Sequence, residues 1–171
     1  MKENSRAIHE SAFQRTVLKL VLFAGALCLG GAAIPAGAES LMAGGQQYCL
    51  TGGLGLDGYD PVAFFPDGGG RPVKGSPTFS FEFDGVPYRF ATQDDLDLFK
   101  ERPARYLPQY GGWCSYSIAL RMGMKGKPEF FEIRGGKLYL FGGSSMQGMW
   151  LMDWQSFVQK ADANWSVLAE N

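Results

Sequence analysis

Two stretches of strand-forming residues, each broken by a tight glycine turn, most constrain what this chain can fold into. In the first, apolar and polar residues alternate over 78–83, a turn follows at Asp84 and Gly85, and 86–91 returns as a second apolar run. In the second, 130–133 and 137–141 flank a pair of glycines. Alternation with a period of two is typical of a half-buried strand, and such turns join antiparallel neighbours. The sequence therefore predicts two β-hairpins.

Helical signals follow each hairpin. Thr92 suits an N-cap position, and Asp94 and Asp95 behind it suit the positive end of a helix dipole. Pro103 ends that helix and is tolerated in the first turn of another. The apolar spacing over 146–168 is typical of one or two further helices. We therefore expect short strands combined with short helices.

The first 38 residues have the pattern of a secretory signal peptide. Basic residues precede an apolar run at 20–29, and Ala-Gly-Ala at 36–38 is a cleavage pattern. The alternative is an uncleaved anchor, but the run is shorter than the roughly 20 apolar residues that a membrane span needs. We expect a periplasmic or secreted protein with no membrane span after cleavage. Residues 39–55, rich in glycine and small residues, are expected to form a flexible lead-in to a domain over 56–168.

Cleavage would remove the single histidine of the chain, His9, and one of its three cysteines, Cys28. Cys49 and Cys114 would remain. Without histidine, a Ser-His-Asp triad, a Cys-His dyad and a histidine zinc site cannot form, so an enzyme is the less favoured class. The formal net charge of −1, with both signs mixed along the chain, predicts no nucleic-acid binding.

A series of short segments carries a family resemblance. They are GYDPVAFF at 58–65, KGSP at 74–77, YRFA at 88–91, LFK at 98–100, PARY at 103–106, PQYGGWC at 108–114, GKLYL at 136–140 and KADANW at 160–165. In order and spacing these segments resemble the YHS domain family, in particular its exported single-domain branch. The resemblance implies an α+β fold, treble-clef-like, with a small antiparallel sheet and short helices. It does not imply a single activity.

The chain departs from this family at the positions that would bind metal. Metal-binding members have cysteine ligands in a D-P-V-C segment and an F-C-x-x-x-C segment. The matching positions here are Ala63, Ala91 and Asp95. Because alanine has no ligand atom, the resemblance implies the scaffold without a thiolate site at its usual place.

Two groups of residues are candidates for a functional site. An aromatic pocket for a small ligand is one hypothesis, although its members could equally be core. These members are Tyr59, Asp60, Tyr110, Trp113, Cys114 and Tyr116. A site for copper is the other, because thiolates and thioethers bind Cu(I), although the methionines could simply fill the core. Its members are Cys114, Met122, Met124, Met146 and Met149.

Cys114 and Asp60 have alternative interpretations. Cys114 is a candidate for a buried small hydrophobe, for a disulfide with Cys49, or for a functional thiol. Asp60 is expected to cap a turn with its own side chain. The leading hypothesis is an exported, non-enzymatic YHS-type module that binds a small ligand, a metal ion or a protein partner. The alternatives are a copper- or metal-handling protein and a thiol-dependent redox protein, which the absence of a C-x-x-C pair disfavours.

Overall fold

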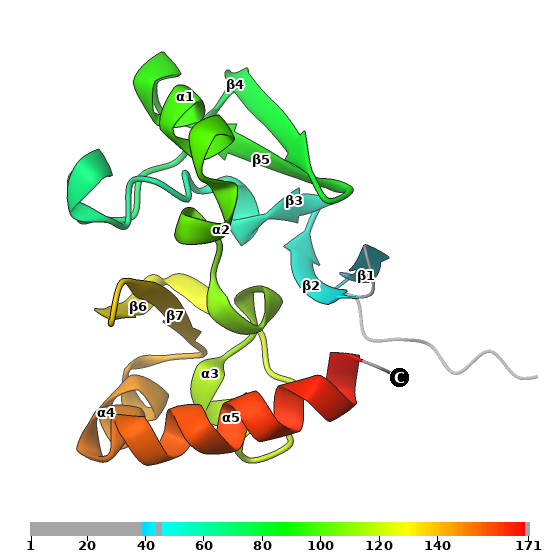
Figure 1. The fold of residues 1–171 in the computed structure, drawn as a ribbon, viewed down its shortest axis with the longest axis vertical. Helices are drawn as coiled ribbons and strands as arrows, with labels where there is room; N and C mark the ends of the chain where they lie inside the picture. Colours follow the sequence, from blue (N-terminus) through cyan, green and yellow to red (C-terminus); the bar gives the residue numbers. More distant parts are fainter. Residues whose placement is uncertain (1–38, 44–45, 170–171) are drawn as a thin grey trace, which may run out of the picture. The chain divides into compact units, whose positions relative to one another are not determined.

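The computed structural model describes residues 39–43 and 46–169, and the predicted signal peptide lies outside them. The described part is a mixed α+β structure with small antiparallel sheets, as expected (Figure 1). Its strands are β1 (Glu39–Ala43), β2 (Gln46–Thr51), β3 (Leu54–Gly55), β4 (Ser76–Phe83), β5 (Val86–Phe90), β6 (Lys127–Arg134) and β7 (Lys137–Phe141). Its α-helices are α1 (Gln93–Glu101), α2 (Pro103–Tyr106), α3 (Ser115–Ala119), α4 (Ser144–Met152) and α5 (Trp154–Ala169). Short 3-10 helices are η1 (Leu56–Gly58), η2 (Pro66–Gly68) and η3 (Gln109–Gly112).

Both predicted hairpins are present. Strands β4 and β5 pair antiparallel, and β6 and β7 do the same. The residues that join them, Asp84 and Gly85 in one hairpin and Gly135 and Gly136 in the other, all have positive φ. This is the conformation that a two-residue turn between twisted strands requires. The N-cap of α1 is also confirmed, because the hydroxyl of Thr92 accepts a hydrogen bond from the backbone N–H of Asp95 at 3.1 Å.

The segment expected to be a flexible lead-in differs from that expectation. Within it β1, β2 and β3 form a three-stranded antiparallel sheet, and Tyr48, Cys49 and Leu50 are buried. Gly52 and Gly53, both with positive φ, turn the chain between β2 and β3. The glycines therefore serve a tight turn, and the apolar residues beside them belong to the core.

Two hydrophobic clusters make up the core. The first joins β4, β5 and α1 to the loop around Phe64, and Phe99 at its centre contacts the rings of Tyr88 and Phe90. The second joins α3 to α4 and α5 around Trp150. Strand β7 serves both, because successive side chains of a strand point to opposite faces. Leu138 and Leu140 belong to the first cluster, and Tyr139 and Phe141 to the second.

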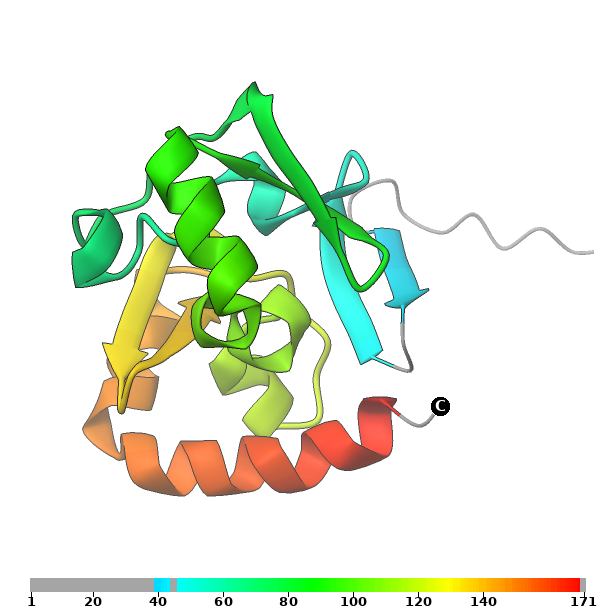
Figure 2. The same ribbon diagram turned by 45° about the horizontal axis from the view of Figure 1, so that its top comes forward.

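Helix α5 packs along α3, and both views show it running past α3 and α4 (Figures 1 and 2). Its N-terminal half carries Trp154, Phe157 and Val158 against the second cluster. Within residues 39–43 and 46–169, no helix combines the length and apolar character that crossing a membrane requires. The C-terminal part of α5 instead brings Asp162 and Trp165 beside η3, where the candidate site lies.

Candidate binding pocket

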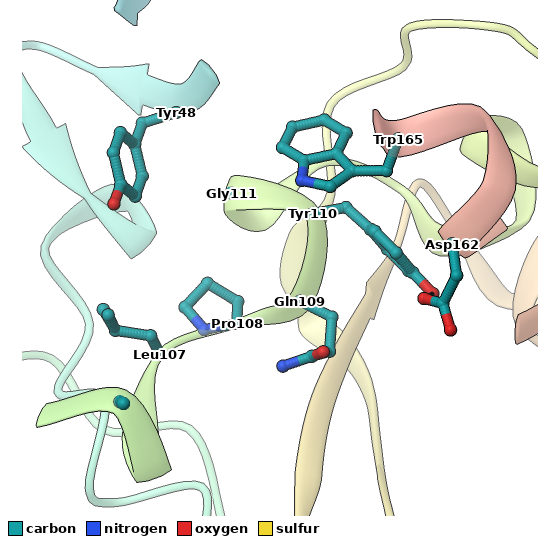
Figure 3. A pocket seen from close by; sticks show the side chains of 9 residues that line it. Tyr48, Leu107, Pro108, Gln109, Tyr110, Gly111, Asp162 and Trp165 are labelled. Carbon is teal, nitrogen blue, oxygen red and sulfur yellow. Dashed lines mark hydrogen bonds between the residues drawn. The ribbon is translucent and has the colours of Figure 1, made fainter. Parts of the chain in front are cut away.

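A pocket of about 330 Å³ lies where β2, the segment from α2 to η3, and α5 meet (Figure 3). Tyr48 of β2 lies across the opening from Pro108 and Trp165. The pocket is lined by Tyr48, Ala104, Leu107, Pro108, Gln109, Tyr110, Gly111, Asp162 and Trp165. Three segments that are distant in the sequence thus supply three aromatic side chains and one carboxylate.

The backbone of η3 is what directs Tyr110 into this pocket. Tyr110 has φ 55° and ψ 37°, and Gly111 has φ 58° and ψ 17°, so two successive residues adopt left-handed conformations. That conformation is uncommon for a residue with a side chain and is typical of functional or tightly constrained sites. The glycines that follow Tyr110 make this sharp reversal possible, and Gly112 brings the chain close to Cys49 of β2.

The hydroxyl of Tyr110 donates a hydrogen bond of 2.8 Å to Oδ1 of Asp162. Burial and this hydrogen bond raise the pKa of Tyr110 above its usual range, so its hydroxyl keeps the proton that it donates. The rings of Tyr110 and Trp165 meet edge to face, with centroids 5.9 Å apart. Tyr48 is held from the other side, because its hydroxyl donates to Asp84 at 2.8 Å. The aromatic walls are therefore fixed in place before any ligand binds.

The pocket has acidic character. Asp162 is an exposed residue on α5, and none of the nine lining residues is Lys, Arg or His. The pKa of the neighbouring Tyr139 is also raised. Burial is the larger cause, and the negative charge of Asp162 is the smaller one. A carboxylate beside aromatic side chains, with no basic side chain in the lining, favours a positively charged ligand over an anion.

Of the six residues predicted for an aromatic pocket, Tyr110 lines this one and the others lie elsewhere. Tyr110 and Cys114 are buried members of the second hydrophobic cluster, and Trp113 and Tyr116 pack against it. Tyr59 is near the surface, where its hydroxyl donates to Glu129 and its ring lies under the ammonium group of Lys74. Four of the six predicted residues therefore share the second hydrophobic cluster, and of these four Tyr110 also lines the pocket.

Asp60 has the turn-capping role expected of it, and a second one. Its carboxylate is fully buried. Oδ1 accepts from the backbone N–H of Val62 at 2.8 Å and of Ala63 at 3.4 Å, while Oδ2 accepts from that of Ala91 at 2.7 Å. The side chain therefore closes its own turn and joins it to the end of β5. Burial raises the pKa of Asp60 to about 6. The hydrogen bonds from the backbone N–H groups of Ala91 and Val62 act in the opposite direction and lower this pKa.

The structure also locates the two cysteines. Cys49 and Cys114 are both buried and both free, so the candidate disulfide is not formed. Burial raises the pKa of the Cys49 thiol to about 11. The thiol of Cys114 instead donates a hydrogen bond to the thioether of Met146, with Sγ and Sδ 3.6 Å apart.

The other methionines proposed as metal ligands are more open to solvent. Met122, Met124 and Met149 are exposed, whereas Met146 is half-buried against the second cluster. In the part of the chain that the structure describes, no three His, Cys, Asp or Glu side chains group as a metal site. The structure thus brings Met146 to Cys114 and leaves the other candidate methionines on the surface.

Comparison of the chain with protein-family models, with curated proteins and with solved structures finds no match. The pocket residues that sequence reasoning missed are chiefly Tyr48, Asp162 and Trp165. One signal could have found two of them, since Asp162 and Trp165 are three residues apart and share a helix face. Tyr48 carries no such signal, because it reaches the pocket only through the pairing of the sheet with η3.

Proposed function

We propose that this chain is an exported, non-enzymatic module of the YHS type that binds a small organic cation in the pocket between β2, η3 and α5. The observation that carries the ligand class is the lining itself. Three aromatic side chains, Tyr48, Tyr110 and Trp165, surround a space that also has the carboxylate of Asp162 in its wall. The proposal of a YHS-type module is supported by the ordered segments from 58 to 165 and by the mixed α+β fold that such a resemblance implies.

The physical argument for a cation rests on the faces of the rings. The negative face of an aromatic ring attracts an ammonium group, and the attraction grows as the group loses water. The negative charge of the carboxylate at the same site also attracts a cation. The volume of about 330 Å³ lies at the lower end of the range for small-molecule sites, which suits a compact amine or quaternary ammonium compound.

The lining offers recognition rather than reaction chemistry. It contains no serine, cysteine or histidine, and its one carboxylate accepts a hydrogen bond from the hydroxyl of Tyr110. A nucleophile paired with a base, which covalent catalysis needs, is not among these nine residues. The prepositioned aromatic walls favour binding with little rearrangement, because rigid side chains lose less conformational freedom when a ligand binds.

Calorimetric titration can test the proposal with matched ligands. A trimethylammonium compound and its uncharged tert-butyl isostere have almost the same shape, so the pocket should prefer the cation. Asp162→Asn and Trp165→Leu should each weaken cation binding by about two- to fivefold, the scale of a single ring or charge contact at an accessible site. Asp153→Asn, at an exposed aspartate that does not line the pocket, is the matched control. Equal affinity for the two isosteres, or unchanged cation binding in Asp162→Asn, would overturn the proposal.

A further inference from the structure

A pair of sulfur atoms in the second hydrophobic cluster is separate from the pocket and unused by the proposed function. Sγ of Cys114 and Sδ of Met146 are 3.6 Å apart, and neither residue lines the pocket. Cys114 is fully buried. The two residues come from different elements, since Cys114 precedes α3 and Met146 lies in the first turn of α4.

The backbone around Cys114 holds its thiol in position. Its N–H donates to the carbonyl of Met124 at 2.8 Å, and its own carbonyl accepts from the N–H of Ile118 at 3.0 Å and from the hydroxyl of Ser117 at 2.8 Å. It also bridges to Leu140 of β7. With both backbone groups bonded, the position of Sγ depends on little more than one side-chain torsion.

The thioether of Met146 is seated against a glycine. A Cβ added at Gly142 would lie 3.0 Å from Sδ of Met146 and 3.4 Å from the carbonyl oxygen of Lys125. The absence of a side chain at Gly142 therefore leaves the space that the sulfur occupies. Any larger residue there would displace the sulfur while leaving both sulfur-bearing residues in the chain.

We propose that Cys114 and Met146 together bind one Cu(I) ion. Thiolate and thioether are the soft ligands that Cu(I) prefers. With metal–sulfur bonds of about 2.3 Å, the length known for zinc thiolates, one ion contacts both sulfurs at an angle of about 100° across the observed 3.6 Å. Because a Cu(I) ion with two ligands prefers a near-linear arrangement, binding requires the half-buried Met146 side chain to move outward, which widens this angle. The site is distinct from the cysteine positions replaced by Ala63, Ala91 and Asp95.

Charge balance favours a monovalent ion here. On binding, the S–H bond of Cys114 breaks, the proton leaves to solvent, and the sulfur lone pair forms the bond to copper. A thiolate with Cu(I) is then neutral overall, which lowers the cost of placing it among the aromatic side chains of the cluster. Zn²⁺ would leave a net positive charge in this apolar surrounding and would require four ligands in place of two.

Exposed thioethers on the same helix offer a route for the ion. Met149 and Met152 follow Met146 at intervals of three residues on α4. Met149 is 48% exposed and Met152 is 79% exposed. Side chains three apart on a helix are neighbours. A soft ion captured at the surface can thus pass from one thioether to the next and reach Met146, which contacts Cys114.

Anaerobic titration of the purified protein with Cu(I), against a competing chelator, tests the site. We expect a single bound ion, release of one proton, and protection of Cys114 from alkylation. Met146→Leu keeps a similar volume and removes the sulfur, and it should weaken binding by at least about tenfold. Met122→Leu, which removes an exposed sulfur outside both the pair and the route on α4, should change the affinity much less.

Gly142→Ala is a second variant that removes no sulfur. Its new methyl group would lie 3.0 Å from Sδ of Met146 and would shift that flexible side chain slightly, so binding should weaken less than in Met146→Leu. Circular dichroism of each variant without copper checks that it is folded. Absence of a stoichiometric ion in the wild type, full affinity in Met146→Leu, or loss of the ion on replacing Cys49 instead of Cys114 would overturn the proposal.

Discussion

Replacement of Asp60 by alanine should destabilise the fold, and the cost should grow as the pH falls. The carboxylate accepts short hydrogen bonds from the backbone N–H groups of Val62 and Ala91, and all of its surface is buried. Alanine leaves both donors without a partner, and each buried, unpaired donor costs about 1–3 kcal/mol. We therefore expect Asp60→Ala to lower the free energy of unfolding by about 2–4 kcal/mol at pH 5.

The sign of the pH dependence follows from the raised pKa of Asp60, about 6 in the folded protein against an ordinary value of 3.8. Between these two values the folded state binds more protons than the unfolded state. Stability from this group therefore rises as the pH falls through 6 toward 4, and it is lost as the pH rises above 6. From pH 7 to pH 5 the wild type should gain about 1 kcal/mol that the alanine variant does not gain.

Urea unfolding at pH 7 and pH 5, followed by tryptophan fluorescence, measures this difference. Effects of titrating groups that do not interact with Asp60 appear in both proteins and cancel when the variant is subtracted from the wild type. The interaction with the neighbouring Asp95, whose charge also raises the pKa of Asp60, is part of the measured difference. Asp97→Ala is the matched control on α1, because Asp97 is exposed, and it should cost less than about 0.5 kcal/mol at both pH values. A gap between wild type and Asp60→Ala that stays constant or narrows at pH 5 would show that the backbone donors keep Asp60 ionised.

Other predictions concern the backbone of the scaffold. A Cβ at Gly75 would overlap the backbone of Arg89, so Gly75→Ala should lower the free energy of unfolding by about 1–3 kcal/mol; wild-type stability in chemical denaturation would contradict the close approach. Gly148 lies on α4, where an added Cβ would meet open space. Gly148→Ala should therefore raise the free energy of unfolding by about 0.5–1 kcal/mol in the same assay. Thr92→Ala removes the N-cap bond to the N–H of Asp95 and should cost about 1 kcal/mol, whereas Thr92→Ser should largely preserve it.

The parts of the fold that could be predicted are those decided within a few residues. The hairpins at Asp84-Gly85 and Gly135-Gly136 follow from strand patterns and turn residues that adjoin each other. The N-cap at Thr92 is equally local. Gly52 and Gly53 show where such reasoning fails, because a glycine turn and a flexible linker have the same composition. The pairing of β2 with β3 and the burial of Tyr48 and Leu50 distinguish them here.

The candidate sites depend on contacts between distant parts of the chain. Tyr110 lies 52 positions before Asp162, and Cys114 lies 32 before Met146, yet each pair is in contact. Neither spacing has a period that a helix or a strand would reveal. The left-handed backbone of η3 also lets Tyr110 line the pocket while it belongs to the second hydrophobic cluster, together with Cys114.

By itself, the sequence determined the local elements: two hairpins, a capped helix and the turn at Asp60. These follow from backbone preferences and side-chain chemistry within one turn of chain. Tertiary structure alone decided which aromatic side chains share a pocket with Asp162 and which thioether meets Cys114. The physical reason is that packing of whole elements, through burial of the two hydrophobic clusters, sets those neighbours, and no short segment contains that information.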